Sequence, residues 1–337
     1  MFTGIKLSST ELSEIFSHLQ KKFDIFGPVR KGDSYFITKI SQAFQIGISQ
    51  YRTVEPLKSF YLPGKEKLTE KSNKPVLIFG VKACDLNSLK VLDYVYLDGE
   101  YRDSYYAWRR ENYFIFSADC TSFLETCFCT SLGYTPYPED GFDWNLIPVA
   151  NDEFVLQVGS PKGEALSKEL KLEIQKIPQH YQELIKKNRE EIYNKVKENA
   201  DKILPLEVKD GLTLAVRNSF DSEIWIKEAE RCVECGACTN ICASCHCFFL
   251  ITEKNGFDKL RVWDSCLYKT YALVAGGANP RKKLSERLRN RFFKKFDFFP
   301  QVLGTFGCTG CGRCISACLG NIDIRKILAQ LVSVNVK

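Results

Sequence analysis

The pattern of apolar and polar residues at the start of the chain predicts a helix followed by short strands. Four apolar residues recur at helical spacing over residues 8–22, namely Leu12, Ile15, Phe16 and Leu19. Ser8 and Glu11 stand where a capping box would begin this helix. Residues 34–62 alternate more closely and carry many aromatic side chains, so we expect short strands there.

Short apolar runs predict three further strands, at residues 75–81, 113–117 and 153–158. The first run leads into Cys84 and a predicted helix, and the second ends close to Cys120. Ligand sites of open α/β sheets gather at the carboxyl ends of the strands. These two cysteines are therefore candidate site residues.

The second half of the chain has the pattern of helices. Residues 163–203 are rich in Lys, Glu and Leu and are interrupted at Pro178, which is typical of two helices with one solvated face. We expect a turn at Asp210-Gly211, a helix that begins near Asp221, and a final helix over residues 324–331.

Composition narrows the class of protein. A chain of 337 residues can form two domains, and its net charge of +6 does not by itself indicate nucleic acid. The sequence has no apolar stretch long enough to span a membrane and no apolar segment after Met1 typical of a secretory signal. Its 15 cysteines, an odd number, indicate metal ligands rather than disulfides. We expect a reducing, cytoplasmic and anaerobic setting.

Two cysteine runs dominate the last third of the sequence. Each has the spacing C-x2-C-x2-C-x3-C, which ligates [4Fe–4S] clusters in bacterial ferredoxins, where the fourth cysteine of each run binds the other cluster. The spacing predicts one cluster on Cys232, Cys235, Cys238 and Cys318, and a second cluster on Cys308, Cys311, Cys314 and Cys242. Gly236, Gly310 and Gly312 would let the backbone approach the cluster sulfides.

Two structural zinc sites are the alternative interpretation of these runs. Ala243 and Leu319 stand where ferredoxins have proline, a change that leaves the thiol ligands intact. The long segment between the runs leaves room for helices. We therefore expect an α+β N-terminal domain over residues 1–215, with short strands and flanking helices, and an α-helical ferredoxin-like domain over residues 216–337.

The remaining cysteines form two groups. Cys84, Cys120, Cys127 and Cys129 could ligate a third [4Fe–4S] cluster or could be buried free thiols. Cys245, Cys247 and Cys266 could hold another metal with His246 or Asp264, replace a ferredoxin ligand, or pack beside the clusters.

Other motifs are weaker. The segment 275–280 is rich in glycine but matches no nucleotide-binding pattern, so a tight turn is favoured, and no flavin motif is found. The basic residues of 281–295 could dock an acidic partner or a phosphate-bearing cofactor, with a solvated helix face as the default. The interleaved aromatics favour a core or a subunit interface. We find no catalytic set, which favours an electron-transfer protein over an enzyme.

Several motifs together resemble a known family. They are Phe79-Gly80-Val81-Lys82-Ala83-Cys84-Asp85, Cys127-Phe128-Cys129, Cys245-His246-Cys247, Trp263-Asp264-Ser265-Cys266, Arg289-Asn290-Arg291-Phe292, and the two cysteine runs. In this order they are similar to the iron–sulfur β subunit of cytoplasmic sulfhydrogenases, the NAD(P)-linked [NiFe] hydrogenases, and to the electron-transfer subunit of anaerobic sulfite reductase. The segments 140–143 and 158–163 look more like the sulfhydrogenase subunit.

The resemblance implies an electron-transfer subunit. It would relay electrons between a FAD- and NAD(P)-binding flavoprotein subunit and a [NiFe] hydrogenase, or in the alternative a sirohaem sulfite reductase. The four N-terminal thiols recur in both families, which favours a third cluster. Two hypotheses of other classes stay open: a thiol or polysulfide reductase that uses Cys245, Cys247 and Cys266, and a zinc-stapled scaffold without a redox role.

Overall fold

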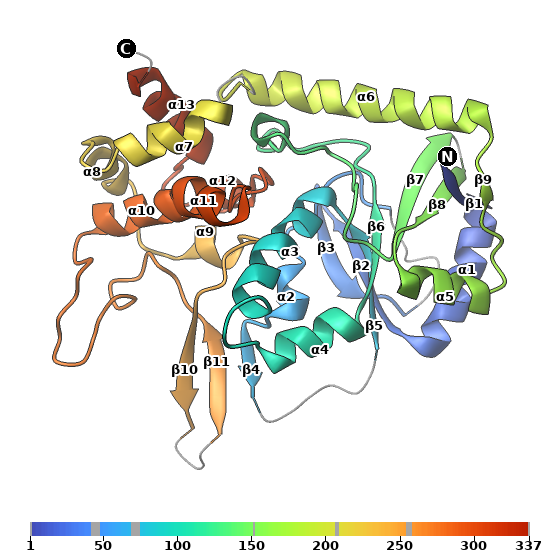
Figure 1. The fold of residues 1–337 in the computed structure, drawn as a ribbon, viewed down its shortest axis with the longest axis horizontal. Coiled ribbons are helices and arrows are strands. Elements are labelled where there is room, and N and C mark those ends of the chain that lie inside the picture. The colour runs from blue at the N-terminus through green and yellow to red at the C-terminus, as the bar shows by residue number, and fades with distance from the viewer. Residues whose placement is uncertain are drawn as a thin grey trace.

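The structure is a computed structural model that describes residues 2–41, 48–68, 75–150, 152–205, 209–253 and 258–335. A β-sheet with flanking helices lies on one side of the molecule and a group of helices on the other (Figure 1). The long helix α6 (Gln179–Asp201) runs from the sheet towards this second group. The mixture of helices and strands expected from the sequence is confirmed.

The described residues of the first half build an eight-stranded sheet in the order β3-β2-β5-β6-β7-β8-β1-β9. The central strands β2, β5, β6 and β7 run parallel, and the strands outside them pair antiparallel. The strands are β1 (Thr3–Ser8), β2 (Asp24–Lys31), β3 (Ser34–Lys39), β5 (Val76–Val81), β6 (Phe114–Ala118), β7 (Trp144–Ala150), β8 (Glu153–Val158) and β9 (Gln175–Lys176).

Helices cover both faces of this sheet. On one face Phe16 of α1 packs on Phe79 and Phe116, with ring centroids 4.9 and 5.9 Å apart. On the other face Ile78 and Ile115 pack against α3. Successive residues of β5 thus face opposite layers, which is why its sequence is continuously apolar. The helices are α1 (Ser9–Lys22), α2 (Lys58–Tyr61), α3 (Ala83–Tyr96), α4 (Ser104–Asn112) and α5 (Pro161–Glu169).

Most of the predicted elements are confirmed, including the helices α5, α6 and α13 (Ile324–Asn335). Of the strands expected over residues 34–62, β3 is present, residues 58–61 form helix α2 instead, and residues 42–47 lie outside the described structure. Helix α1 begins with the predicted capping box of Ser8 and Glu11, and the three apolar runs are β5, β6 and β8. The predicted turn at Asp210-Gly211 is wrong, because both residues lie in helix α7 (Lys209–Asn218). A Cβ on Gly211 would meet open space, so this glycine marks no tight turn.

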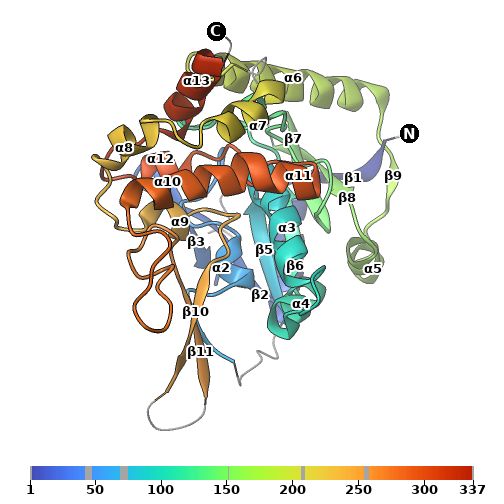
Figure 2. The same cartoon turned by 60° about the vertical axis from the view of Figure 1, so that its left-hand side comes forward.

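The second half is helical with one β hairpin. Strands β10 (Phe248–Thr252) and β11 (Lys259–Trp263) project from the helices, and β11 pairs with β4 (Lys65–Lys67) of the first half. Figure 2 shows the hairpin extending away from the body. The sequence predicted only helices here, so that expectation is wrong for these strands. Strand β11 has β4 as a second partner, almost 200 residues earlier in the chain, and local pattern does not reveal that pairing.

The helices of the second half share one core with α6 and α7. Its buried members include Leu212, Trp225, Phe292 and Leu328. The predicted boundary between residues 215 and 216 falls within α7, which packs on α13, and the division into two domains stays a prediction. The remaining helices are α8 (Ile224–Ala229), α9 (Ala237–Asn240), α10 (Leu284–Phe293), α11 (Phe299–Leu303), α12 (Arg313–Ser316) and α13 (Ile324–Asn335).

Short elements complete the chain: a 3-10 turn at Thr130–Leu132 and a π-helix at Lys294–Phe298 that continues α10. Over the described ranges, no helix has both the length and the apolar character needed to cross a membrane.

Candidate iron–sulfur centres

The first cysteine run folds into a tight turn followed by α9. Glu234 and Gly236 take left-handed backbone conformations, with φ of 54° and 69°, which reverse the chain between the cysteines. Five thiols line one hollow, and four of them are those that the ferredoxin spacing assigns to the first cluster. We call these four set one: Cys232, Cys235, Cys238 and Cys318. The fourth member comes from the second run, as the ferredoxin spacing predicts.

Set one lies near the molecular surface. Cys235 is exposed, and two apolar neighbours in the chain, Val233 and Leu319, keep 61% and 75% of their surface exposed. Isolated exposed apolar residues are common, but here they adjoin a candidate redox centre. Set one is therefore the most accessible of the cysteine groups.

Set two, defined as Cys242, Cys308, Cys311 and Cys314, lies deeper. Beyond the effect of burial, the thiols of Cys314 and Cys311 lie near enough to Cys308 for their charges to raise its pKa. Those of Cys311 and Cys242 add in the same way to the rise that burial causes in the pKa of Cys314. Burial raises the pKa of Cys308 to about 12. This thiol would stay protonated at neutral pH by itself, so iron must replace its proton.

The Cys242 thiol differs from its partners in set two. A hydrogen bond from Cys245 holds the pKa of Cys242 well below its usual value, and the nearby Lys295 ammonium adds to this effect. Lys295 Nζ lies 3.3 Å from Cys242 Sγ and also donates to the Gly307 carbonyl at 2.8 Å. The Cys245 thiol and the Lys295 ammonium thus both favour the thiolate form of Cys242.

These groups fit clusters better than single ions. A zinc ion needs its sulfur ligands within about 2.3 Å of one centre. In the part of the chain that the structure describes, no three His, Cys, Asp or Glu side chains meet that closely. A [4Fe–4S] cube instead takes one thiolate at each of four separate iron atoms, and so needs thiols spread around a hollow. Set one has this arrangement.

The four N-terminal cysteines also meet. Cys84 lies in the first turn of α3 and Cys120 directly after β6, and because β5 and β6 are neighbouring parallel strands, both thiols lie at one edge of the sheet. Cys127 and Cys129 come from the loop that follows. We call these four the N-terminal set. They line one hollow together with Cys311 of set two.

Burial raises the pKa values of the thiols in the N-terminal set. It raises the pKa of Cys120 to about 12 and the pKa values of Cys84 and Cys129 well above their usual range. Lys82 is buried beside them and donates to the carbonyls of Ser49 and Asp119 at 2.6 and 2.9 Å. Burial lowers the pKa of Lys82, the nearby Cys120 thiol opposes this effect, and the Lys82 ammonium in turn lowers the pKa of Cys120.

A buried ion pair joins the N-terminal set to set two. Arg313 lies between Cys311 and Cys314 in the sequence, and its side chain is fully buried. It donates to both carboxylate oxygens of Asp85, at 3.0 and 2.7 Å. Asp85 is the residue after Cys84. The bidentate geometry fixes the position of both partners.

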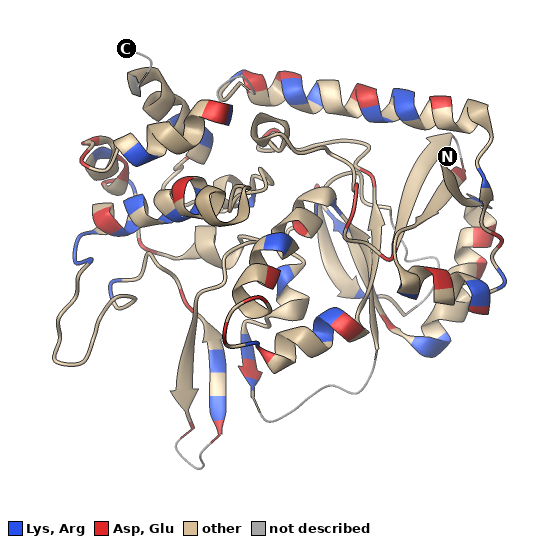
Figure 3. Ribbon diagram, in the orientation of Figure 1, with Lys and Arg blue, Asp and Glu red and all other residues tan. Residues whose placement is uncertain are grey.

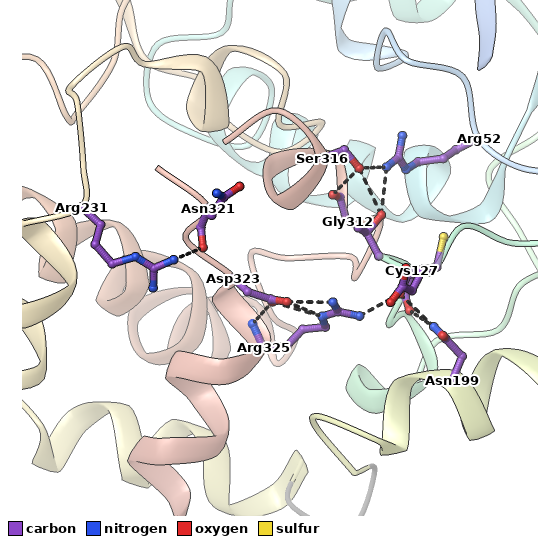
Figure 4. A network of polar contacts seen from close by, with 11 residues as sticks. Arg52, Cys127, Asn199, Arg231, Gly312, Ser316, Asn321, Asp323 and Arg325 are labelled. Atoms are coloured by element: carbon purple, nitrogen blue, oxygen red, sulfur yellow. Dashed lines mark hydrogen bonds and ion pairs between the residues drawn. The ribbon is translucent and has the colours of Figure 1, made fainter. Parts of the chain in front are cut away.

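Figure 4 shows a second connection between the same two groups. Arg52 donates to the Cys311 carbonyl and to Ser316 Oγ, and Thr126 Oγ1 lies 3.1 Å from that same serine oxygen. Arg325 donates to the Glu125 carbonyl at 2.8 Å. Side chains from three distant segments thus hold the loop that carries Cys127 against the second cysteine run.

Two glycines make this approach possible. Gly310 and Gly312 have φ of 67° and 69°, and a Cβ on either one would overlap the backbone of the 126–129 loop. The Phe128 amide donates to the Gly310 carbonyl at 2.8 Å. The sequence assigned these glycines to the approach of cluster sulfides. In the structure they also allow contact with the N-terminal set.

Cys245 lies beside set two, and Cys266 lies near Cys247 and near Cys238 of set one. Cys245 contacts Cys242, and Cys247 Sγ donates to Tyr271 Oη at 3.5 Å. Burial lowers the pKa of His246 to about 3, so its ring is neutral. No further metal site is assembled here within the described residues, and the roles of the three thiols stay predictions.

The basic segment 281–295 is only partly a solvated helix face. Its side chains at Arg287, Arg291 and Lys295 are buried, whereas Lys282 and Lys283 are exposed. Figure 3 shows the basic residues of α10 in blue. The default interpretation is wrong for the three buried residues. They recur every four residues, a spacing that places them on one helical face and could have predicted their burial. Phe292, Phe293 and Phe296 belong to the core, as the sequence suggested.

Comparisons with known proteins agree with this geometry. Residues 231–322 match the family model of a 4Fe-4S dicluster domain. Over 339 aligned residues the chain is 34% identical to sulfhydrogenase 2 subunit beta of Pyrococcus furiosus, covering 97% of this chain and 98% of that protein. These matches support [4Fe–4S] clusters over the zinc interpretation of the runs.

Proposed function

This chain belongs to the family of iron–sulfur β subunits of sulfhydrogenases, and on that premise we propose that it transfers electrons within a larger complex. It would relay electrons between an NAD(P)H-oxidising flavoprotein subunit and a [NiFe] hydrogenase catalytic subunit. The observation that carries this proposal is the adjacency of the three cysteine sets. Cys311 lines the hollow of the N-terminal set, and Cys314 lines the hollow of set one.

We infer that three [4Fe–4S] clusters occupy these sets, with set two in the middle. Each cluster supplies reversible one-electron transfer. The chain supplies the thiolates, the buried cations Lys82 and Lys295 that favour them, and the ion pair of Asp85 with Arg313 that keeps two sets together.

Both ends of this row reach the surface. At one end Cys235 is exposed. At the other, Cys120 lines the inner hollow and also an open groove with Asp119 and Arg189. A relay needs one exit towards each partner, and the arrangement offers two. We infer that the two partner subunits dock at these opposite ends, in a reducing, cytoplasmic compartment.

Replacing one ligand of set one tests the relay. Cys235→Ala should remove one cluster signal from the electron paramagnetic resonance (EPR) spectrum and abolish NAD(P)H-linked turnover of the purified complex. Tyr101→Ala is the control, since this side chain is 84% exposed and lies outside all the cysteine groups, so turnover and all signals should stay intact. Unchanged turnover in Cys235→Ala would rule out the relay role.

The metal content of the complex identifies the partner. Nickel near one atom per complex, after anaerobic purification through a tag on this chain, is expected for a hydrogenase. A sirohaem spectrum without nickel would favour the sulfite reductase alternative instead. Reduction of polysulfide by the isolated chain with an artificial donor, lost in Cys266→Ala, would favour the thiol reductase.

A further inference from the structure

Arg291 on α10 is buried, and two of its guanidinium nitrogens have no hydrogen-bond partner among the described residues. Only 5% of its surface is exposed, and the two nitrogens are Nε and Nη2. No carboxylate from the described ranges forms an ion pair with it. Burying a guanidinium charge without a counter-charge or hydrogen bonds costs free energy. The groups that surround Arg291 should therefore include one that stabilises its charge.

Arg291 faces sulfur on two sides. It lines the hollow of set one together with Cys238 and Cys314. Besides these two thiols, those of Cys245 and Cys242 contribute to the field on its guanidinium. Since Cys238 belongs to set one while Cys314 and Cys242 belong to set two, the guanidinium lies between the two sets.

We propose that Arg291 is a positioning residue that donates N–H hydrogen bonds to sulfur atoms of both sets and raises the reduction potential of the cluster at each. The inference rests on the proposed function, which puts a cluster in both sets. Reduction adds one electron to a cluster, with no bond formed and no proton moved. A buried cation that hydrogen-bonds to sulfur stabilises the added negative charge.

The shape of the guanidinium suits this position. Its planar fork presents donors in several directions, so one side chain can serve two sets, whereas a lysine ammonium is a single point of charge. Lys295, one turn further along, shows the contrast. Its ammonium is directed to Cys242, Ser244 and the Gly307 carbonyl, on the side of set two.

Arg287, one turn before Arg291, provides a matched control. It is equally buried, at 1% exposure, but its guanidinium donates to the carbonyls of Leu267, Arg281 and Lys282 and pairs with Glu234 at 3.0 Å. All of these hydrogen-bond acceptors of Arg287 are oxygen atoms. Glu234 lies in the turn of set one, so substitution of Arg287 can affect that set, but no contact among the described residues joins Arg287 to a thiol of set two and the potential there should not change.

The test is an EPR-monitored redox titration of the anaerobically purified complex, with iron and sulfide measured on the same samples. Arg291→Gln should make reduction of both clusters less favourable by about tenfold, which is about 59 mV for one electron. Arg291→Lys should restore one potential more fully than the other, because a single ammonium cannot reach both sets. Arg287→Gln should leave the potential at set two unchanged, because its partner Glu234 lies in the turn of set one.

Several results would overturn the proposal. Unchanged potentials in Arg291→Gln at full iron content would make Arg291 a space-filling residue. Equal shifts in Arg287→Gln would assign the effect to packing. Loss of iron from both Arg291 variants, with none from Arg287→Gln, would assign Arg291 to cluster assembly instead. Failure of the proposed function is separate, because it would appear as missing iron in the unmodified complex.

Discussion

Set one and the N-terminal set both gather four cysteines around a hollow, yet they are built in different ways. Three thiols of set one come from one turn of seven residues, Cys232 to Cys238, bent by two left-handed backbone conformations. The N-terminal set draws its thiols from the ends of two strands and a separate loop. Set one includes an exposed cysteine, Cys235, whereas the cysteines of the N-terminal set are partly or fully buried.

The difference teaches which interactions each site depends on. The geometry of set one is mostly local and should survive changes elsewhere. The geometry of the N-terminal set relies on contacts with the second cysteine run, through Asp85 and Arg313, through Arg52, and through the glycines at 310 and 312. Variants at those contacts should therefore affect the N-terminal set first.

The largest effect is expected for Asp85→Ala. It leaves the fully buried Arg313 guanidinium without its counter-charge, which should lower the free energy of unfolding by about 3–5 kcal/mol. Iron should fall from about twelve to about eight atoms per chain as the N-terminal set loses its cluster. Denaturant unfolding and iron analysis measure the two results.

Asp140→Ala is the control, because this exposed carboxylate pairs with Lys90 at 3.2 Å and should contribute no more than about 1 kcal/mol. If Asp85→Ala lost the set one signal and kept the others, the comparison between the two sites would be wrong.

An intermediate effect is expected for Gly310→Ala. Its Cβ would overlap the backbone at Cys129 and Phe128 and push the loop away from the second run. Such overpacking costs about 1–3 kcal/mol beyond the backbone strain. Thermal unfolding and the EPR signal of the N-terminal set report the change.

Gly304→Ala separates the two contributions. Gly304 has φ of 66°, almost the same as Gly310, but nothing lies within 4 Å of a Cβ placed there. Equal losses in both variants would show that backbone strain alone matters and that the close approach does not.

The smallest effect is expected for Asn199→Ala on α6. Its amide donates to the carbonyls of Glu125 and Cys127 at 3.0 and 3.3 Å, and losing these bonds should cost about 0.5–1.5 kcal/mol. The N-terminal cluster should bleach faster under mild oxidant while set one is unaffected. Asn194→Ala on the exposed side of the same helix should change neither stability nor bleaching rate.

The fold could be predicted only in part, because some elements depend on local sequence and others on contacts between distant segments. Helix α1 and strands β5, β6 and β8 follow from local patterns, because capping and burial periodicity act over a few residues. The hairpin β10–β11 was missed, because β11 is completed by β4 from the other half of the chain. Arg291 was assigned to a solvated face, since charge alone gave no sign of the sulfur around it.

The sequence by itself determined the chemistry of this protein. The spacing of the cysteine runs implies the cluster type, because three thiols of each run lie within one turn, whatever surrounds them. Only the tertiary structure decided the order of the sites, with set two between the others, and the meeting of the four N-terminal thiols. Those relations join residues as far apart as Asp85 and Arg313, and packing and buried ion pairs, rather than local spacing, bring such residues together.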